Sequence, residues 1–300
     1  MNLCYNKSNS WENMLKGIAD KNDVEFCNCN PFPLEFEGLV NQILAKRIDP
    51  SDKIYDELKK KVAEQLVSQT LRKDDLHKMY VSLPVNHILT TNYDYILERA
   101  YENDFNRPSK TSGEETKYSL HRKIELDRKC FHHIHGEAKY PSTLCLGYEH
   151  YVGYLTKMRE YLRAEQKVSK RFDGNAVTLR PPKINKDGKT EQEKPSWLNL
   201  FFTHDVYIVG LGLAPCEIDL WWLLTYRAYL YHTNDSGLRN IMKNRIVIYN
   251  SKYKYKNLLE NLHVKCKDVE VKDGDYLSAY ETIHQMIEKS IEKRGEQDEN

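Results

Sequence analysis

The sequence predicts an α/β fold in which a mostly parallel sheet carries helices on both faces. Short apolar runs of strand length alternate along the chain with longer segments of helical period. Each run is followed directly by polar or glycine-rich residues, as at the carboxyl ends of parallel strands. The 300 residues are 40% hydrophobic and 30% charged, a balance typical of a globular domain rather than a disordered chain.

Apolar residues in the first half of the chain recur with helical or strand spacing. Ile54, Leu58 and Val62 are four residues apart with Lys and Glu between them, which predicts an amphipathic helix with one buried stripe. Pro84 precedes a short apolar run closed by polar residues, as expected of a buried strand. The predicted elements are a helix at 54–71, a strand at 85–89, a helix at 95–101 and a strand at 131–134, with a loop at 107–115.

The second half of the chain repeats this alternation. Tyr151, Tyr154 and Met158 lie at helical spacing, and two later apolar runs end at Gly210 and Asn250, as buried parallel strands do. The predicted elements are a helix at 148–168, a strand at 206–209, a helix from about 215 to 231, a strand at 246–249 and a helix at 276–291.

We expect one domain over residues 1–291, followed by a charged tail at 292–300. A helical insertion is expected at about 148–200. Within it, residues 171–196 lack apolar periodicity, which predicts a long loop.

No apolar run reaches the roughly 18 residues that span a bilayer, and no signal peptide begins the sequence, so a cytoplasmic protein is expected. Lys and Arg number 45 against 44 Asp and Glu, so the net charge gives no reason to expect nucleic acid binding.

The seven cysteines are an odd number, which favours reduced thiols in a cytoplasmic protein. Cys27 and Cys29 are closer together than the Cys-x-x-Cys pairs of structural zinc sites, and no second pair follows them. His132, His133 and His135 form another cluster, in which strand alternation puts His133 and His135 on one face, but we assign no acidic or Cys third ligand to them. We therefore predict no metal site.

Polar and glycine-rich residues follow four of the predicted strands. Because the carboxyl ends of parallel strands meet at one edge of a sheet, we expect these residues to form one site. They are Thr90, Thr91, Asn92, Tyr93 and Asp94 after the first strand, His135 and Gly136 after the second, Gly210, Gly212 and Leu213 after the third, and Asn250 at the end of the fourth.

These motifs resemble those of sirtuin-like NAD-binding domains, in particular the bacterial sirtuin-like NAD-hydrolysing effectors of antiphage defence. Residues 88–94 resemble that family's Thr-Thr-Asn-Tyr-Asp motif, and residues 134–136 resemble its His-Gly motif. Residues 208–213 resemble its later glycine-rich turn, with Glu217 and Asp219 on the following helix, and residues 247–250 resemble a strand that ends in a ribose-contacting Asn. The four motifs occur in the family order.

The resemblance implies a Rossmann-like NAD glycohydrolase that cleaves NAD to ADP-ribose and nicotinamide and acts as a homo-oligomer or with a defence-system partner protein. It implies catalytic roles for His135 and Asn92. A histidine with a pKa near 6.5 suits a general base, and an Asn amide can orient a water or a ribose hydroxyl. The implied NAD contacts are Thr90, Thr91, Tyr93, Asp94, Gly136, Gly210, Gly212, Leu213 and Asn250.

Purely structural interpretations of two motifs stay open. The cluster after the first strand could cap a helix. Gly210 and Gly212 lack the third glycine of a dinucleotide fingerprint and could form a tight turn.

Members of the family begin with a strand and a glycine-rich loop that binds the pyrophosphate. In this sequence the first glycine is Gly17, and residues 10–15 resemble the family's segment just after that loop. We expect that strand and loop to be missing. The alternative function is therefore a catalytically degenerate NAD- or ADP-ribose-binding or assembly subunit. A protein deacetylase is not expected, because zinc-binding Cys pairs are absent.

Overall fold

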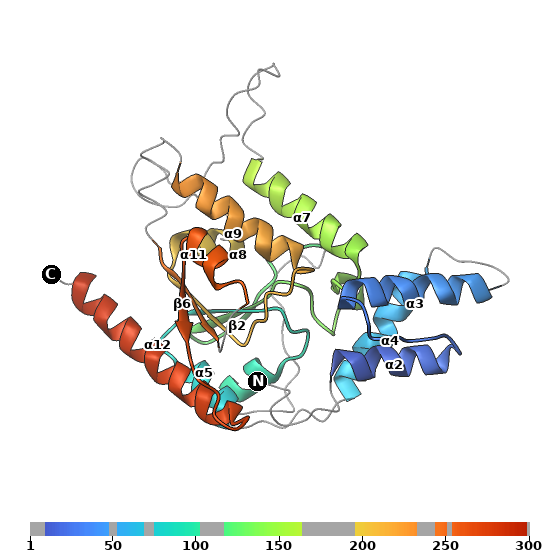
Figure 1. The fold of residues 1–300 in the computed structure, drawn as a ribbon, viewed down its shortest axis with the longest axis horizontal. Coiled ribbons are helices and arrows are strands. Elements are labelled where there is room, and N and C mark those ends of the chain that lie inside the picture. Colours follow the sequence, from blue (N-terminus) through green and yellow to red (C-terminus); the bar gives the residue numbers. More distant parts are fainter. Residues whose placement is uncertain are drawn as a thin grey trace, which may run out of the picture.

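The computed structural model describes residues 10–47, 53–68, 75–102, 117–163, 196–232, 244–250 and 254–298. Six strands form two three-stranded sheets in this part of the chain. Helices α5 and α12 lie below the sheets in Figure 1, α7, α8, α9 and α11 lie above them, and α2, α3 and α4 lie at one end. The predicted α/β architecture, a Rossmann-like arrangement with helices on both faces, is confirmed.

The first sheet contains β1 (His87–Thr90), β3 (Lys129–His133) and β2 (Ile124–Leu126), in the order β1-β3-β2. Strands β1 and β3 are parallel, as predicted. Strand β2 was not predicted from the sequence, and it joins β3 as an antiparallel hairpin. Asp127 sits in the hairpin turn with a φ of 47°, a conformation that Asp tolerates better than most residues.

The second sheet contains β4 (Val206–Val209), β5 (Ile246–Asn250) and β6 (Val264–Asp268), all parallel. The first four residues of the central strand β5 are buried, which explains its continuous apolar run. The predicted bounds of β4 are confirmed. Strand β6 was not predicted, because Lys265 and Lys267 interrupt its apolar pattern. Charged residues of this kind are common on edge strands.

The helices surround these sheets in three groups. Helices α2 (Trp11–Lys21), α3 (Phe32–Lys46) and α4 (Ile54–Ser68) share a hydrophobic cluster that also contains Tyr93. Helices α5 (Asp75–Ser82) and α12 (Tyr276–Asp298) contact each other, and α6 (Ile96–Glu102) contacts α5. The remaining helices are η2 (Pro141–Thr143), α7 (Tyr148–Arg163), α8 (Trp197–Thr203), α9 (Ile218–Tyr231) and α11 (Lys256–Asn261).

One helix boundary differs from the prediction. Helix α12 runs on to Asp298, so the charged segment from residue 292 mostly extends the helix instead of fraying. Helix α7 is described as far as Arg163, and the remainder of its predicted span, 164–168, lies outside the described residues. The predicted loops at 107–115 and 171–196 lie outside the described residues, apart from Ser196, which caps α8. In the part of the chain that is described, none of the helices combines the length and the apolar character that a bilayer span requires.

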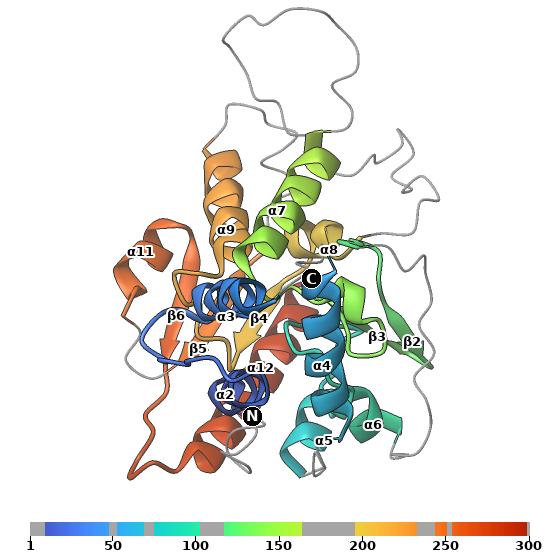
Figure 2. The ribbon, with the colours of Figure 1, turned by 90° about the vertical axis from the view of Figure 1, so that its right-hand side faces the viewer.

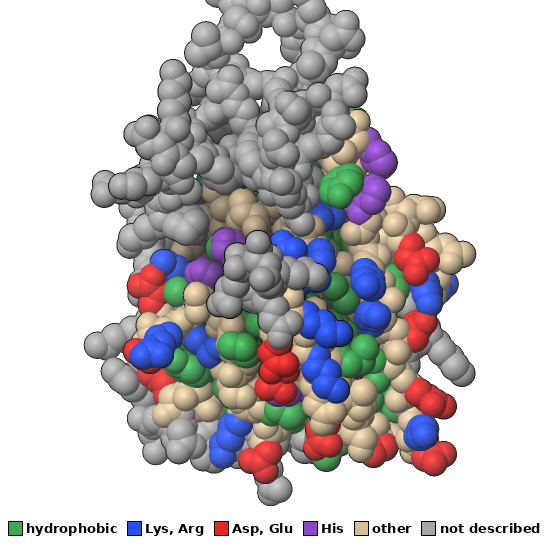
Figure 3. All heavy atoms as spheres, turned by 90° about the vertical axis from the view of Figure 1, so that its left-hand side faces the viewer, with side chains coloured by type: hydrophobic (Ala, Val, Ile, Leu, Met, Phe, Trp, Pro, Cys, Tyr) green, Lys and Arg blue, Asp and Glu red, His purple; other side chains and the backbone are tan. Residues whose placement is uncertain are grey.

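The surface drawn in Figure 3 carries charges of both signs. Lys and Arg side chains alternate there with Asp, Glu and hydrophobic side chains, with no separation into one basic and one acidic area on the described part of that face. This mixture agrees with the near-zero net charge of the sequence.

A groove separates the two sheets. In the described residues, β1 pairs with β3 and β4 pairs with β5, and the two groups of strands lie on opposite sides in Figure 2. Between β1 and β4 lies a cavity of about 970 Å³, bordered also by α5, α8, α9 and α12. All residues of β1 and β4 are only half-buried, unlike those of β5. We call this cavity the inter-sheet groove.

The turn after β3 depends on Gly136. Its φ is 102°, and a Cβ at this position would lie 2.3 Å from the carbonyl oxygen of Thr143. That neighbour is backbone, held in the short helix η2, so it cannot rotate away. Only glycine satisfies both conditions.

We therefore expect Gly136→Ala to lower the free energy of unfolding by about 3 kcal/mol, because it combines backbone strain with a collision. Urea unfolding followed by Trp fluorescence measures the change. Gly38→Ala on α3 is the matched control: a Cβ there meets nothing within 4 Å, so this change should stabilise the helix by about 0.5 to 1 kcal/mol. Equal effects of the two substitutions would contradict this account of the turn.

Candidate active site at the strand ends

Residues from three of the four motifs line the inter-sheet groove, with Ile134 as the contribution of the second motif. The motif after β1 and the turn after β4 come from different sheets, yet both border the same cavity. This agrees with the expectation that the carboxyl ends of the strands meet. The site residues on this wall are Thr90, Thr91, Asn92, Gly210 and Leu213.

His135 lies behind this wall, with only 2% of its surface exposed. Its Nε2 is 2.8 Å from Oδ2 of Asp219, in the first turn of α9. A carboxylate only accepts hydrogen bonds, so Nε2 carries the hydrogen, and Nδ1 is the acceptor in the neutral ring. Tyr151 and Tyr154 face the imidazole edge-on, with ring centroids 5.3 Å and 6.1 Å away.

The contact between His135 and Asp219 was missed from the sequence. The two residues are 84 positions apart, and Asp219 was noted only as part of the motif that follows the glycine-rich turn. Its second oxygen, Oδ1, is buried and has no hydrogen-bond partner in the described part of the protein. An unsatisfied buried carboxylate oxygen is costly, and it could accept a hydrogen bond from a water or a ligand hydroxyl.

The beginning of α9 places acidic and apolar groups around His135. Glu217 caps the turn, because its Oε2 accepts a hydrogen bond of 2.7 Å from the N–H of Ala214. Burial raises the pKa of Glu217, and the charge of Asp219 raises it further, whereas that N–H and His135 lower it. Burial also raises the pKa of Cys145 to about 12, so this neighbour stays a thiol at neutral pH. The surroundings of His135 thus contain two acidic residues and a thiol.

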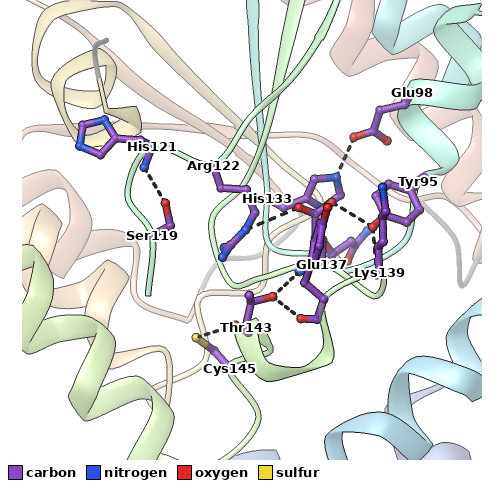
Figure 4. Close-up of polar contacts among 12 residues, drawn as sticks. Tyr95, Glu98, Ser119, His121, Arg122, His133, Glu137, Lys139, Thr143 and Cys145 are labelled. Atoms are coloured by element: carbon purple, nitrogen blue, oxygen red, sulfur yellow. Dashed lines mark hydrogen bonds and ion pairs between the residues drawn. The ribbon is translucent and has the colours of Figure 1, made fainter. Parts of the chain in front are cut away.

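The side chain of Asn92 is exposed, whereas its backbone N–H and carbonyl both make hydrogen bonds to side chains. Its N–H donates to Oγ1 of Thr90 at 3.1 Å, and its carbonyl accepts from Nδ1 of His133 at 2.9 Å. Nε2 of His133 donates in turn to Oε1 of Glu98 at 2.7 Å (Figure 4). Both side chains of that ion pair are almost completely buried. In the described residues, no hydrogen bond joins Asn92 to His135, so the two proposed catalytic residues are held by separate contacts.

A second polar network, around Glu137, lies beside this ion pair in Figure 4. The Tyr95 hydroxyl donates to Oε2 of Glu137 at 2.9 Å, and Arg122 pairs with Oε1 at 3.6 Å. The N–H of Glu137 donates to Oγ1 of Thr143 at 3.2 Å. Because Tyr95 follows β1 and Glu137 follows β3, this network fixes the two site turns relative to each other.

The other predicted contacts with NAD lie away from the groove wall. The Tyr93 ring is buried, and its hydroxyl donates to the carbonyl of Cys145 at 2.5 Å. Asp94 accepts from the N–H of Ile96 at 3.0 Å, as a cap at the start of α6 does, and burial raises its pKa. The carbonyl of Asn250 accepts from Val269 at the end of β5. The residues that are outside the groove lining are Tyr93, Asp94, Gly136, Gly212 and Asn250.

The cysteine expectation was wrong for one pair, since Cys27 and Cys29 form a disulfide. The two sulfurs and a carboxylate oxygen of Glu35 all lie within 4.8 Å of one another. With both cysteines reduced, these three atoms could hold a metal ion. Glu35 is engaged already, because its Oε1 accepts hydrogen bonds from the backbone N–H groups of Cys29 and Asn30. The disulfide also removes the thiolates that a metal needs.

The support of Asn92 by His133 predicts a pH dependence. Burial alone would lower the pKa of His133, but the charge and hydrogen bond of Glu98 raise it to about 9. A pKa above the unfolded value near 6.5 stabilises the fold fully below that value, and the stabilisation is lost as the pH rises through 9. We expect the free energy of unfolding to fall between pH 7 and pH 10.

Glu98→Gln should remove this dependence and cost about 3 kcal/mol at pH 7, because it leaves a buried histidine without its counter-charge. Urea unfolding at several pH values measures both effects. Glu160→Gln, at an exposed position on α7, should change neither. The account fails if the wild type and Glu98→Gln lose stability in parallel above pH 8.

A comparison with protein families supports the coarser part of the sequence interpretation. Residues 86–178 match the model of a family described as SIR2-like domain. The matched segment begins just before β1 and includes both site turns described above, with His133, His135 and Glu137. No curated protein is significantly similar to the chain. Residues 86–178 are therefore similar to a SIR2-like domain, and the described part of this segment contains both strands and helices.

Proposed function

We propose that this protein is a sirtuin-like NAD glycohydrolase that cleaves NAD to ADP-ribose and nicotinamide and acts as a cytoplasmic antiphage-defence effector. The observation that carries the proposal is the His135–Asp219 pair at the strand ends of a SIR2-like segment. SIR2-like domains bind NAD, which makes NAD the substrate to test first. We also propose that the protein works as a homo-oligomer or with a defence-system partner protein.

The reaction requires a base and a well-placed water. The bond between the nicotinamide nitrogen and the ribose carbon breaks, the bonding electrons leave with nicotinamide, and positive charge develops on the ribose. A water oxygen then bonds to that carbon and loses one proton. In our proposal Nδ1 of His135 accepts this proton, and Asp219 stabilises the resulting imidazolium through its hydrogen bond to Nε2.

Asn92 is proposed to orient the attacking water or a ribose hydroxyl. Its exposed amide offers a donor and an acceptor without adding charge. Gly210 lines the same groove with a φ of 66°, which favours glycine, and a Cβ there would lie 3.0 Å from the hydroxyl of Tyr280. Thr90 and Thr91 add hydroxyl groups to the same wall.

One observation favours the second candidate, a degenerate subunit that binds NAD or ADP-ribose or serves in assembly. His135 is almost completely buried and is not among the residues that line the groove. A base must come within hydrogen-bond reach of the proton that it removes. In this candidate, His135 and Asp219 hold the two sheets together and perform no chemistry.

Incubation of the purified protein with NAD, followed by chromatography of nicotinamide, distinguishes the two candidates. We expect turnover that His135→Ala and Asn92→Ala each lower by at least about 100-fold, the usual contribution of acid–base catalysis. His232→Ala and Asn257→Ala are controls at exposed positions outside the proposed site and should retain activity. Bacteria that express the wild type, but not His135→Ala, should produce fewer phage plaques.

Each outcome of this assay decides between the candidates. Turnover that persists in both site variants would refute the assigned catalytic roles. Calorimetric binding of NAD or ADP-ribose without turnover would reject the hydrolase and support the binding subunit. An absence of both turnover and binding would reject a role in NAD chemistry.

A further inference from the structure

The loop between α2 and α3 carries two cysteines that take no part in the candidate active site. Cys27 and Cys29 form a disulfide, and both residues are exposed. Asn28 between them has a φ of 53°, a left-handed conformation that Asn tolerates better than most residues. The loop precedes the segment that matches the SIR2-like family. The disulfide is thus open to reagents in solution and separate from the site turns.

A disulfide across so short a segment adds less to the stability of the fold than a long-range one. Cross-links stabilise a protein largely because they restrict the unfolded chain, and this restriction grows with the number of residues enclosed. The bond between Cys27 and Cys29 encloses a single residue. Because both cysteines are exposed, the thiolate of a reductant can reach the bond. The fold therefore tolerates either redox state of the pair.

Hydrogen bonds that do not depend on the disulfide hold the loop on both sides of the pair. Before it, the side chain of Gln42 accepts from the N–H of Glu25 at 3.0 Å and donates to its carbonyl at 3.1 Å. After it, Oε1 of Glu35 accepts from the N–H groups of Cys29 and Asn30, at 3.1 and 2.8 Å. Both Gln42 and Glu35 belong to α3. After reduction, the two thiols would therefore stay close together.

Glu35 also brings a carboxylate to the two sulfurs. One of its oxygens lies within 4.8 Å of both, although Glu35 itself is buried, with 8% of its surface exposed. Its hydrogen bonds within the described residues all go to Oε1, the third coming from Nδ2 of Asn30 at 2.9 Å. Hydrogen bonds of this kind orient the ligands of metal sites. They leave the lone pairs of Oε2 for a cation.

We propose that Cys27, Cys29 and Glu35 form a redox-gated site for a thiophilic divalent cation such as Zn²⁺. In the reduced protein, two thiolates and one carboxylate supply three ligands of the types that Zn²⁺ takes, and a water completes the tetrahedron. Thiolate ligands select Zn²⁺ over Mg²⁺ and Ca²⁺, which prefer oxygen. In the oxidised protein the sulfurs are bonded to each other, so the site does not bind.

Binding requires only a small movement of the side chains. Zn–S bonds of about 2.3 Å at the tetrahedral angle place two sulfurs about 3.8 Å apart. The Cα atoms of Cys27 and Cys29 are 5.3 Å apart. Rotation about the two Cα–Cβ bonds can therefore reach the required separation while the backbone keeps its hydrogen bonds to α3.

The exchange between the two states needs a dithiol reductant and a disulfide oxidant. The dithiol transfers two electrons and two protons to the Cys27–Cys29 bond, which breaks into two thiols, and the reductant becomes a disulfide. Zn²⁺ then displaces both thiol protons. In the reverse direction, the oxidant takes two electrons from the two thiolates, and its own S–S bond breaks into two thiolates. The Cys27–Cys29 bond forms again, and Zn²⁺ is released.

The test compares the full chain with the disulfide reduced and with it intact. A phosphine reduces the protein and is then removed, and mass spectrometry counts the free thiols. Zn²⁺ is titrated by calorimetry, and Cd²⁺ is titrated as a probe whose bonds to sulfur produce an ultraviolet charge-transfer band. We expect the reduced protein to bind Zn²⁺ at least about 100-fold more tightly than the oxidised protein, because only the reduced form offers thiolates. NAD is absent throughout, so the result does not depend on the proposed function.

Two pairs of variants identify the ligands. Cys27→Ser should weaken Zn²⁺ binding to the reduced chain at least about 100-fold, whereas Cys216→Ser, which removes a free thiol elsewhere, should not change it. Glu35→Gln removes the charge but keeps an acceptor for the backbone N–H groups, and it should weaken binding about tenfold. Glu25→Gln removes the same charge from an exposed side chain of the loop and should have no such effect. Urea unfolding shows whether each variant is folded.

Three results would overturn the proposal. Equal Zn²⁺ affinity of the reduced and oxidised protein would mean that the thiolates are not ligands. Unchanged affinity in Cys27→Ser or in Glu35→Gln would place the ion elsewhere on the chain. Cysteines 27 and 29 that both remain free thiols after treatment with oxidised glutathione would show that the site has no redox gate.

Discussion

The hydrogen bond between His135 and Asp219 connects two halves of a protein that the sheets leave separate. His135 follows β3 of the first sheet, and Asp219 lies in the helix that follows β4 of the second. In the described residues, no backbone ladder crosses the groove between them. The side-chain contact is supported by one apolar cluster, to which Ile134 of the first half and Leu213 and Leu220 of the second contribute. Because both polar side chains are buried, loss of one leaves the other without a partner at a high cost in free energy.

The end of β3 organises the site in both directions. His133 reaches toward β1 and α6, where it contacts the backbone of Asn92 and the carboxylate of Glu98. His135, two residues later, reaches toward α9. Gly136 makes the sharp turn that separates these two contacts from the network of Glu137. One short segment thus positions the exposed amide of Asn92 and the buried imidazole of His135, and a change in its path would disturb both.

The sequence predicted elements where local pattern and burial agree. Strand β4 and the centre of β5 are continuous apolar runs, and their bounds were found to within one residue. Strands β2 and β6 were missed, because edge strands face solvent and carry charged residues such as Lys265. Helix α12 extends past its last apolar residue, because exposed helical turns need no apolar pattern. The approximate place of the site was predictable, because strand ends meet by topology. The partners of His135 and His133 were not, since each contact joins residues far apart in the chain.

The position of α12 has a consequence for the order in which the molecule is made. Ile287, Ile291 and Arg294 line one face of the groove, and they belong to a helix that is synthesised after every described strand of both sheets. Until α12 has left the ribosome, the strands β1 and β4 lack its cover on that face. The growing chain therefore exposes apolar residues of two strands, which are prone to associate with other chains, from the time β4 emerges until α12 follows. Docking of α12, with the Tyr80 hydroxyl donating to the carbonyl of Tyr280, covers that face.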